Sequence, residues 1–256
     1  MERESSLLYI TPLIFNGVIV VDYAKCSEKL VSILGLKNEP VAVKLYKKGE
    51  PLPTEYPLPE KNIRHCQSIM RARKGECLLV PANKHACPVG GSALGLIPTP
   101  EKVVQGTFHY TLGMYDSEEA ARHTIEVRPA LEPESIGATL VCPLSKTKYE
   151  PDVIVVVGTP EQIYWLMPAA ATYMEGGRVN ISTASFQASC ADSTILPFTT
   201  GAPNISMGCY GCRKATDIAP EEMLMGLPAS SLERTVGILE KLNEKAIPSC
   251  RGQSKA

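Results

Sequence analysis

The chain has 256 residues, a formal net charge of −1, 44% hydrophobic residues and 21% charged residues. This length and composition are typical of a globular protein that buries its own core and needs no disulfide framework. The basic residues are scattered and lack interleaved aromatic side chains, and no apolar run reaches the about 18 residues of a membrane span. We therefore expect neither a nucleic-acid partner nor a membrane-embedded segment.

The expected compartment follows from the first residues and from the cysteines. The chain does not start with a basic segment followed by an unbroken apolar run, so the sequence predicts no export signal and a cytoplasmic location. Nine cysteines, an odd number, in a reducing compartment favour thiol chemistry or metal binding over a set of disulfides.

The predicted elements begin with a hairpin in an N-terminal extension over 1–21, because Asn16-Gly17 suits a tight turn. A helix over 22–34 follows, with Asp22 as its N-cap and Gly35 as its stop. The rest of the first half is expected to contain a strand over 40–46, a helix over 65–74, a strand over 76–80, helices that open at Cys87-Pro88 and near residues 99 and 116, and a strand over 136–144.

The second half is expected to contain a buried strand over 152–157, a helix from Thr159 to about Glu175 kinked at Pro168, a strand over 179–183, a helical stretch from Cys190, a strand over 204–207 and a last helix over 228–245. Strands that alternate with helices predict an α/β fold with mixed sheet or sheets and flanking helices. We expect one compact domain over 22–256. The similar spacing of two strands before Cys87 and before Cys190 leaves open two related halves, 22–145 and 146–250, with internal pseudo-symmetry.

The pair Cys209 and Cys212 is the strongest chemical signal in the sequence. Two thiols three positions apart in a glycine-rich run can point at one metal centre or at each other. Cys87 and Cys190 each open an expected helix, where free backbone N–H groups favour a thiolate. We therefore predict that Cys87, Cys190, Cys209 and Cys212 converge on one metal site.

Four thiolates suit either zinc or an iron–sulfur cluster. Zinc sites more typically combine two close Cys or His pairs, whereas here one pair is tight and the other donors are dispersed, which favours a [4Fe–4S] cluster. Two further interpretations stay open, a redox dithiol and simple packing of small buried residues. The dithiol fits poorly because the motif comes late in the chain and Pro220 follows it.

Residues around these cysteines supply further candidates. Cys66, next to His65, is an alternative ligand, a reactive thiol or a core residue, and Arg64, Arg71 and Arg73 either form a solvated helix face or hold an anion. We expect the surroundings of the metal to include Gly208 and Gly211, whose N–H groups would turn toward the sulfurs, the cations Arg213 and Lys214, and His85. Cys26, Cys77 and Cys142 are interpreted as packing residues and Cys250 as exposed.

An ordered series of motifs gives the chain a family resemblance. In the first half these are Pro40–Lys44 and Cys87-Pro-Val-Gly-Gly, and in the second half Glu150–Ile154, Cys190-Ala-Asp and Gly208–Lys214. Over about residues 22–245 the chain resembles the uncharacterised archaeal and bacterial family called domain of unknown function 169. The resemblance implies a soluble α/β protein common in anaerobes and methanogens, a setting compatible with an oxygen-sensitive cluster, and it implies no established reaction.

The sequence thus predicts a cytoplasmic [4Fe–4S] protein that serves electron transfer or cluster-assisted chemistry on a small anionic ligand. The alternative is a non-catalytic ligand-binding or regulatory module with a structural zinc or with no metal. Whether the protein is an enzyme stays open. Apolar helix faces favour a homodimer, and electron transfer would require a redox partner protein.

Overall fold

The computed structural model describes residues 13–15, 18–186 and 188–252. Near its start, β1 (Leu13–Phe15) and β2 (Val18–Val20) pair antiparallel with Leu13 opposite Val20, as the hairpin prediction requires. The Asn16-Gly17 turn itself, together with the rest of the N-terminal extension before β1, lies outside the described residues.

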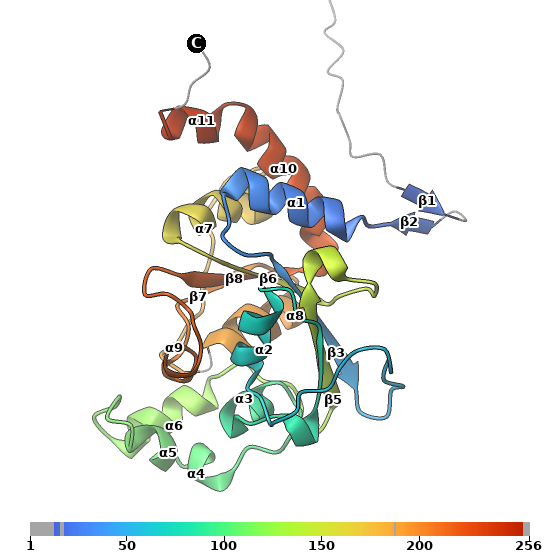
Figure 1. Cartoon of the computed structure of the whole chain (residues 1–256). Coiled ribbons are helices and arrows are strands. Elements are labelled where there is room, and N and C mark those ends of the chain that lie inside the picture. The colour runs from blue at the N-terminus through green and yellow to red at the C-terminus, as the bar shows by residue number, and fades with distance from the viewer. Residues whose placement is uncertain (1–12, 16–17, 187, 253–256) are drawn as a thin grey trace, which may run out of the picture.

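Six further strands form one sheet, and its spatial order is β4-β5-β3-β6-β8-β7 (Figure 1). These strands are β3 (Val41–Lys47), β4 (Leu78–Pro81), β5 (Ile136–Pro143), β6 (Val153–Gly158), β7 (Asn204–Ser206) and β8 (Met223–Pro228). The predicted α/β class with flanking helices is confirmed, and every neighbouring pair in this sheet is antiparallel. Its first three positions hold strands from 22–145 and its last three hold strands from 146–250, while the duplication itself stays a prediction.

One face of the sheet, which we call the longer-helix face, is covered by amphipathic helices, two of which are the longest within the described residues (Figure 1). These are α1 (Tyr23–Leu34), α7 (Pro160–Met167) and α10 (Leu232–Glu244), with the short α11 (Ala246–Cys250) after them. Ala42, Ile154 and Val156 point from the sheet into this layer. The Asp22 carboxylate accepts a hydrogen bond from the Lys25 N–H at 2.9 Å, so α1 begins as predicted.

Mostly shorter helical segments cover the opposite face, which we call the shorter-helix face. They are α2 (His65–Ala72), α3 (Pro88–Ala93), the π-helix η4 (Ala188–Ile195), α8 (Leu196–Thr200) and α9 (Tyr210–Ala215). Val153 and Val155 alternate with their neighbours in β6 and face this side, as the two-residue period of a strand dictates. Beyond α3 lie α4 (Glu101–Val104), α5 (Thr107–Tyr110) and α6 (Glu118–Glu126), at the lower left of Figure 1.

One element prediction in the second half is wrong. Residues 179–183 form no strand, because their polar groups bond to side chains instead of to a neighbouring strand: the Asn204 side chain binds the Ser182 backbone and Asp192 accepts from the Thr183 hydroxyl. The repeated strand spacing before Cys190 therefore has no counterpart in the fold. The helix predicted to run to about Glu175 continues past Pro168 as a π-helix, η3 (Pro168–Thr172).

The strand β8, which lies between β6 and the edge strand β7, was not predicted from the sequence. Its residues, Met-Leu-Met-Gly-Leu-Pro, include no β-branched side chain, and glycine and proline weaken a strand pattern. Gly226 is required there by packing, since a Cβ at this position would lie 2.1 Å from the Ser193 carbonyl oxygen. The close approach of η4 to the sheet therefore requires a glycine at this position. A glycine lacks the β-branched side chain that usually marks a buried strand in the sequence.

Candidate metal centre

Five cysteines from four separate segments line one pocket of about 230 Å³ on the shorter-helix face of the sheet. They are Cys66 of α2, Cys87 before α3, Cys190 of η4, and Cys209 and Cys212 at the start of α9. We call this the cysteine pocket. The structure thus brings together the four predicted ligands and the predicted alternative.

Cys87 and Cys190 meet at the backbone of Gly90. Cys87 is the N-cap of α3, and its sulfur accepts a hydrogen bond from the Gly90 N–H at 3.3 Å. A Cβ added at Gly90 would lie 2.8 Å from the Cys190 sulfur and 3.6 Å from the Cys87 sulfur. Because Gly90 has no side chain, both sulfurs can approach its backbone at the edge of the pocket.

Cys209 and Cys212 are held by the first turn of α9. Cys209 is the N-cap, and its sulfur accepts from the Cys212 N–H at 3.3 Å. The Cys212 sulfur lies 3.7 Å from the Thr216 hydroxyl one turn later. Gly208, in a left-handed conformation with φ of 76°, turns the chain into this helix. Its N–H donates to the Ser206 hydroxyl at 3.1 Å, so the expectation that it points at a sulfur is wrong.

Cys66 and Cys212 shift each other's pKa inside the pocket. A hydrogen bond to Cys212, together with burial and the neighbouring thiols, raises the pKa of Cys66. The hydrogen bond from Cys66 outweighs burial and lowers the pKa of Cys212 to about 6. Burial, and then the nearby Cys87, Cys209 and Cys212, raises the pKa of Cys190. The pocket thus has sulfurs close enough to repel one another when they are ionised.

His85 supports the Cys87 turn, as its predicted place beside the site implied. Its Nδ1 lies 3.2 Å from the Cys87 carbonyl oxygen, and a carbonyl only accepts, so Nδ1 carries the proton. Burial lowers the pKa of His85 to about 4, which leaves the ring neutral. His65 is also buried, and its Nε2 lies 3.0 Å from the Thr194 hydroxyl.

The predicted cations divide into two groups. Lys214 lines the cysteine pocket, and so does Arg64, whose Nη1 donates to the Gly211 carbonyl at 3.4 Å. Arg213 does not line it, because its guanidinium donates to the backbone carbonyls of Met207, Ala219 and Glu222. Its charge still contributes to lowering the pKa of Cys212.

The other two arginines proposed for an anion are engaged in ion pairs. Arg71 pairs with Glu76 on the surface. Arg73 is buried, and its Nη1 lies 3.0 Å from both carboxylate oxygens of Glu222, with Asp217 as a second acidic neighbour. Neither lines the cysteine pocket. Of the three arginines, Arg64 alone lies where it could reach an anion in this pocket.

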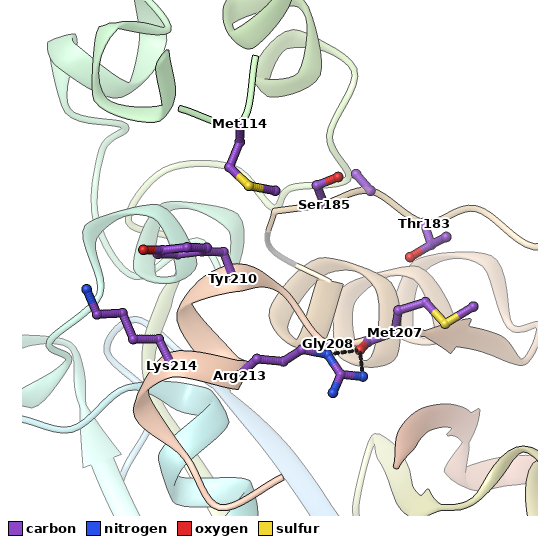
Figure 2. Close-up of a pocket in the computed structure, with 9 residues that line it drawn as sticks. Met114, Thr183, Ser185, Met207, Gly208, Tyr210, Arg213 and Lys214 are labelled. Carbon is purple, nitrogen blue, oxygen red and sulfur yellow. Dashed lines mark hydrogen bonds between the residues drawn. The ribbon is translucent and has the colours of Figure 1, made fainter. Parts of the chain in front are cut away.

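A second, more open pocket of about 640 Å³ adjoins the first. Its wall includes Met114, Ser185 and Met207, and we call it the outer pocket. Tyr210 and Lys214 line both pockets, and Figure 2 shows them on the same side of the outer one. The Lys214 ammonium lies 5.7 Å from the centre of the Tyr210 ring. These two side chains therefore stand between the outer pocket and the sulfurs.

Sequence reasoning missed the aromatic wall of the cysteine pocket. Phe108, His109 and Leu112, in and just after α5, and Phe186, before η4, line it. No motif marks them, since their segments are short and come from distant parts of the chain.

The remaining cysteines lie where packing was predicted. Cys26 is buried among the helices of the longer-helix face, and Cys142 is buried in β5 next to the half-buried Cys77. Cys250 is exposed at the end of α11. Across the ranges that the structure describes, no group of three or more His, Cys, Asp or Glu side chains converges closely enough to hold a single metal ion.

Comparisons with known proteins place this fold and site in a family without an assigned reaction. The sequence profile of domain of unknown function 169, described as uncharacterised ArCR, matches residues 29–237, and the chain belongs to this family. The uncharacterized protein MJ0308 of Methanocaldococcus jannaschii is 35% identical over 221 residues, which cover 85% of this chain and 94% of that protein. No solved structure matches. No helix within the described residues is both long enough and apolar enough to cross a membrane.

Proposed function

We propose that this protein binds a [4Fe–4S] cluster through Cys87, Cys190, Cys209 and Cys212, with Cys66 as the alternative ligand. The observation that carries the proposal is the gathering of five thiols from four segments of the chain around one pocket. A bound cluster would supply one-electron chemistry or a Lewis-acidic iron. The protein would serve electron transfer, or chemistry on a small anionic ligand held beside the cluster.

The chemistry of the donors fits such a group. Two of the sulfurs already accept backbone N–H hydrogen bonds, from Gly90 and from Cys212, and hydrogen bonds to sulfur help to set the potential of a cluster. Arg64 and Lys214 bring positive charge to the wall, which balances the negative charge of several thiolates. None of the described residues that line the pocket is an aspartate or a glutamate.

The spacing of the cysteines in the sequence, one tight pair with dispersed partners, favours a cluster over a single zinc ion. A zinc ion needs its sulfurs about 2.3 Å from one point, and the described cysteines do not converge in that way. A four-iron cube instead bonds each thiolate through a different iron atom, so its ligands surround a larger volume. The alternative, a ligand-binding or regulatory module with a structural zinc or no metal, is the other outcome of the test.

The test is to purify the protein without oxygen, record its visible spectrum, and count iron, zinc and acid-labile sulfide per chain. We expect a brown protein with iron and sulfide in equal amounts, about four of each per chain. Stoichiometric zinc in a colourless protein would support the structural-zinc alternative. Absence of both metals after anaerobic purification would refute the cluster.

The ligand set is tested by cysteine variants. Cys209→Ser is expected to reduce bound iron several-fold, because a hydroxyl is a poorer ligand than a thiolate, while Cys250→Ser, at an exposed position, retains the wild-type amount. Cys66→Ser separates the two ligand schemes, since it leaves the iron in place if the four predicted cysteines are the ligands. Equal iron in the Cys209 and Cys250 variants would contradict the assignment.

The wider setting is part of the same proposal. A cluster protein of this kind would work in the cytoplasm, pass electrons to a partner protein, and pair with a second copy of itself. Light scattering of the anaerobically purified protein tests the pairing, and a mass of one chain at all concentrations would rule it out.

A further inference from the structure

His109 is a buried polar side chain whose ring nitrogens have no partner. Only 1% of the residue is exposed, and neither Nδ1 nor Nε2 has a hydrogen-bond partner among the described residues. The ring packs edge-on against Phe108 and Phe186, with centroids 5.2 and 4.4 Å away. It lines the cysteine pocket.

The surroundings of His109 supply packing and no polar contact. A phenylalanine would make the same aromatic contacts without burying two unpaired nitrogens, which costs stability when no partner is present. An imidazole at this position therefore has a role only if something in the pocket pairs with it. The pocket has room for such a partner, because it adjoins the outer pocket at Tyr210 and Lys214.

The charges around the pocket indicate the sign of that partner. Arg64 and Lys214 line it, and no described lining residue carries a negative charge apart from ionised thiols. Arg128 is close enough to His109 for its charge to act on the ring, and it has no acidic partner within the described ranges; its hydrogen bonds go to the hydroxyls of Ser92 and Thr99. Burial and then the charge of Arg128 lower the pKa of His109 to about 4, so the ring is neutral and keeps one N–H donor.

We propose that the cysteine pocket binds a small oxyanion, a carboxylate or an inorganic oxoanion, and that His109 donates a hydrogen bond to one of its oxygens. Arg64 and Lys214 balance its charge, and the ligand reaches the pocket from the outer pocket past Tyr210 and Lys214. The inference rests on the proposed function in one respect: it identifies the anionic ligand held beside the sulfurs that would bind the cluster.

The experiment measures thermal unfolding of the full chain, purified without oxygen, in sodium formate, sodium bicarbonate or sodium phosphate, each against sodium chloride at equal ionic strength. A ligand that binds the folded state raises the melting temperature in proportion to its affinity. We expect at least one of the three probes to raise it in the wild type. A higher melting temperature in formate indicates a carboxylate site. A higher melting temperature in bicarbonate or phosphate indicates a site for an inorganic oxoanion.

His109→Phe is the decisive variant, because it keeps the aromatic packing and removes both nitrogens. We expect it to weaken anion binding by about tenfold or more, as loss of a hydrogen bond to a charged group does, and so to reduce the shift strongly at the same anion concentration. His123→Phe is the matched control, since the His123 side chain is 73% exposed on α6. Lys214→Gln should reduce the shift in part, because Arg64 remains.

The outcomes separate this inference from the proposed function. A shift of wild-type size in His109→Phe, or no shift with any probe in the wild type, overturns the anion site. Iron is counted in the same samples, and His109→Phe is expected to hold as much iron as the wild type. An iron-free wild type that still responds through His109 would refute the cluster and leave the anion site standing.

Discussion

The two faces of the central sheet are built on different principles. On the face covered by α1, α7 and α10, the interior is a continuous apolar layer that contains fully buried side chains such as Leu30 and Ile154. On the face covered by α2, α3, η4 and α9, the interior contains five cysteines and three histidines with unpaired ring nitrogens, among the residues that the structure describes.

This difference separates stability from function. Close packing of apolar side chains stabilises the fold and leaves no space for a ligand. Unpaired polar groups next to a pocket destabilise the folded protein, and they persist in functional sites because they serve binding or chemistry. The longer-helix face therefore supplies most of the stability of the fold. The shorter-helix face contains the groups that a ligand or a metal would engage.

The largest effect expected from this comparison is on the packed face. Leu30→Ala in α1 removes a side chain with 0% exposure and leaves a cavity, so we expect a loss of about 2–5 kcal/mol in the free energy of unfolding. Chemical denaturation followed by circular dichroism measures it. Iron per folded chain should stay at the wild-type value, because α1 lies across the sheet from the sulfurs. Loss of iron from well-folded Leu30→Ala would show that the two faces are coupled.

A smaller effect on stability and a large effect on metal are expected from Gly90→Ala in α3. The new Cβ would lie 2.8 Å from the Cys190 sulfur, so the thiol must rotate away from the pocket. Alanine also favours the helix, and we therefore expect a net change of no more than about 1 kcal/mol in unfolding free energy. Iron per chain, counted after anaerobic purification, should fall several-fold. Wild-type iron in this variant would exclude Cys190 as a ligand.

The fold was predictable where local pattern and tertiary role agree. Asp22 and Gly35 delimit α1, and the β-branched run of β6 marks a buried strand, so these elements lie close to their predicted bounds. The pattern failed for β8 and for residues 179–183. In both places the contacts of η4 with its neighbours decide the structure, and such contacts between distant segments leave no periodic signal in the sequence.

The candidate site was predictable in its thiols and in two of their expected neighbours, Gly211 and Lys214. Cysteine spacing pointed to Cys209 and Cys212, and the structure places Cys87, Cys190 and Cys66 around the same pocket. Arg213 was expected beside the metal because it follows Cys212 in the chain, but consecutive residues on a helix point in different directions. The aromatic wall was out of reach of sequence reasoning for the same reason as β8, since α5 reaches the pocket through the tertiary fold.

The smallest effect is a gain in stability, and it uses glycines away from the pocket. Gly237→Ala in α10 places a Cβ where no atom lies within 4 Å, so we expect about 0.5–1 kcal/mol more unfolding free energy from helix propensity, with unchanged iron. Gly35→Ala is the matched control: it also meets nothing within 4 Å, but its φ of 70° strains alanine, so stability should fall. A gain in both variants would mean that the positive φ at Gly35 does not strain an alanine there. A loss in both would mean that Gly237 packs more tightly against its neighbours than its open surroundings indicate.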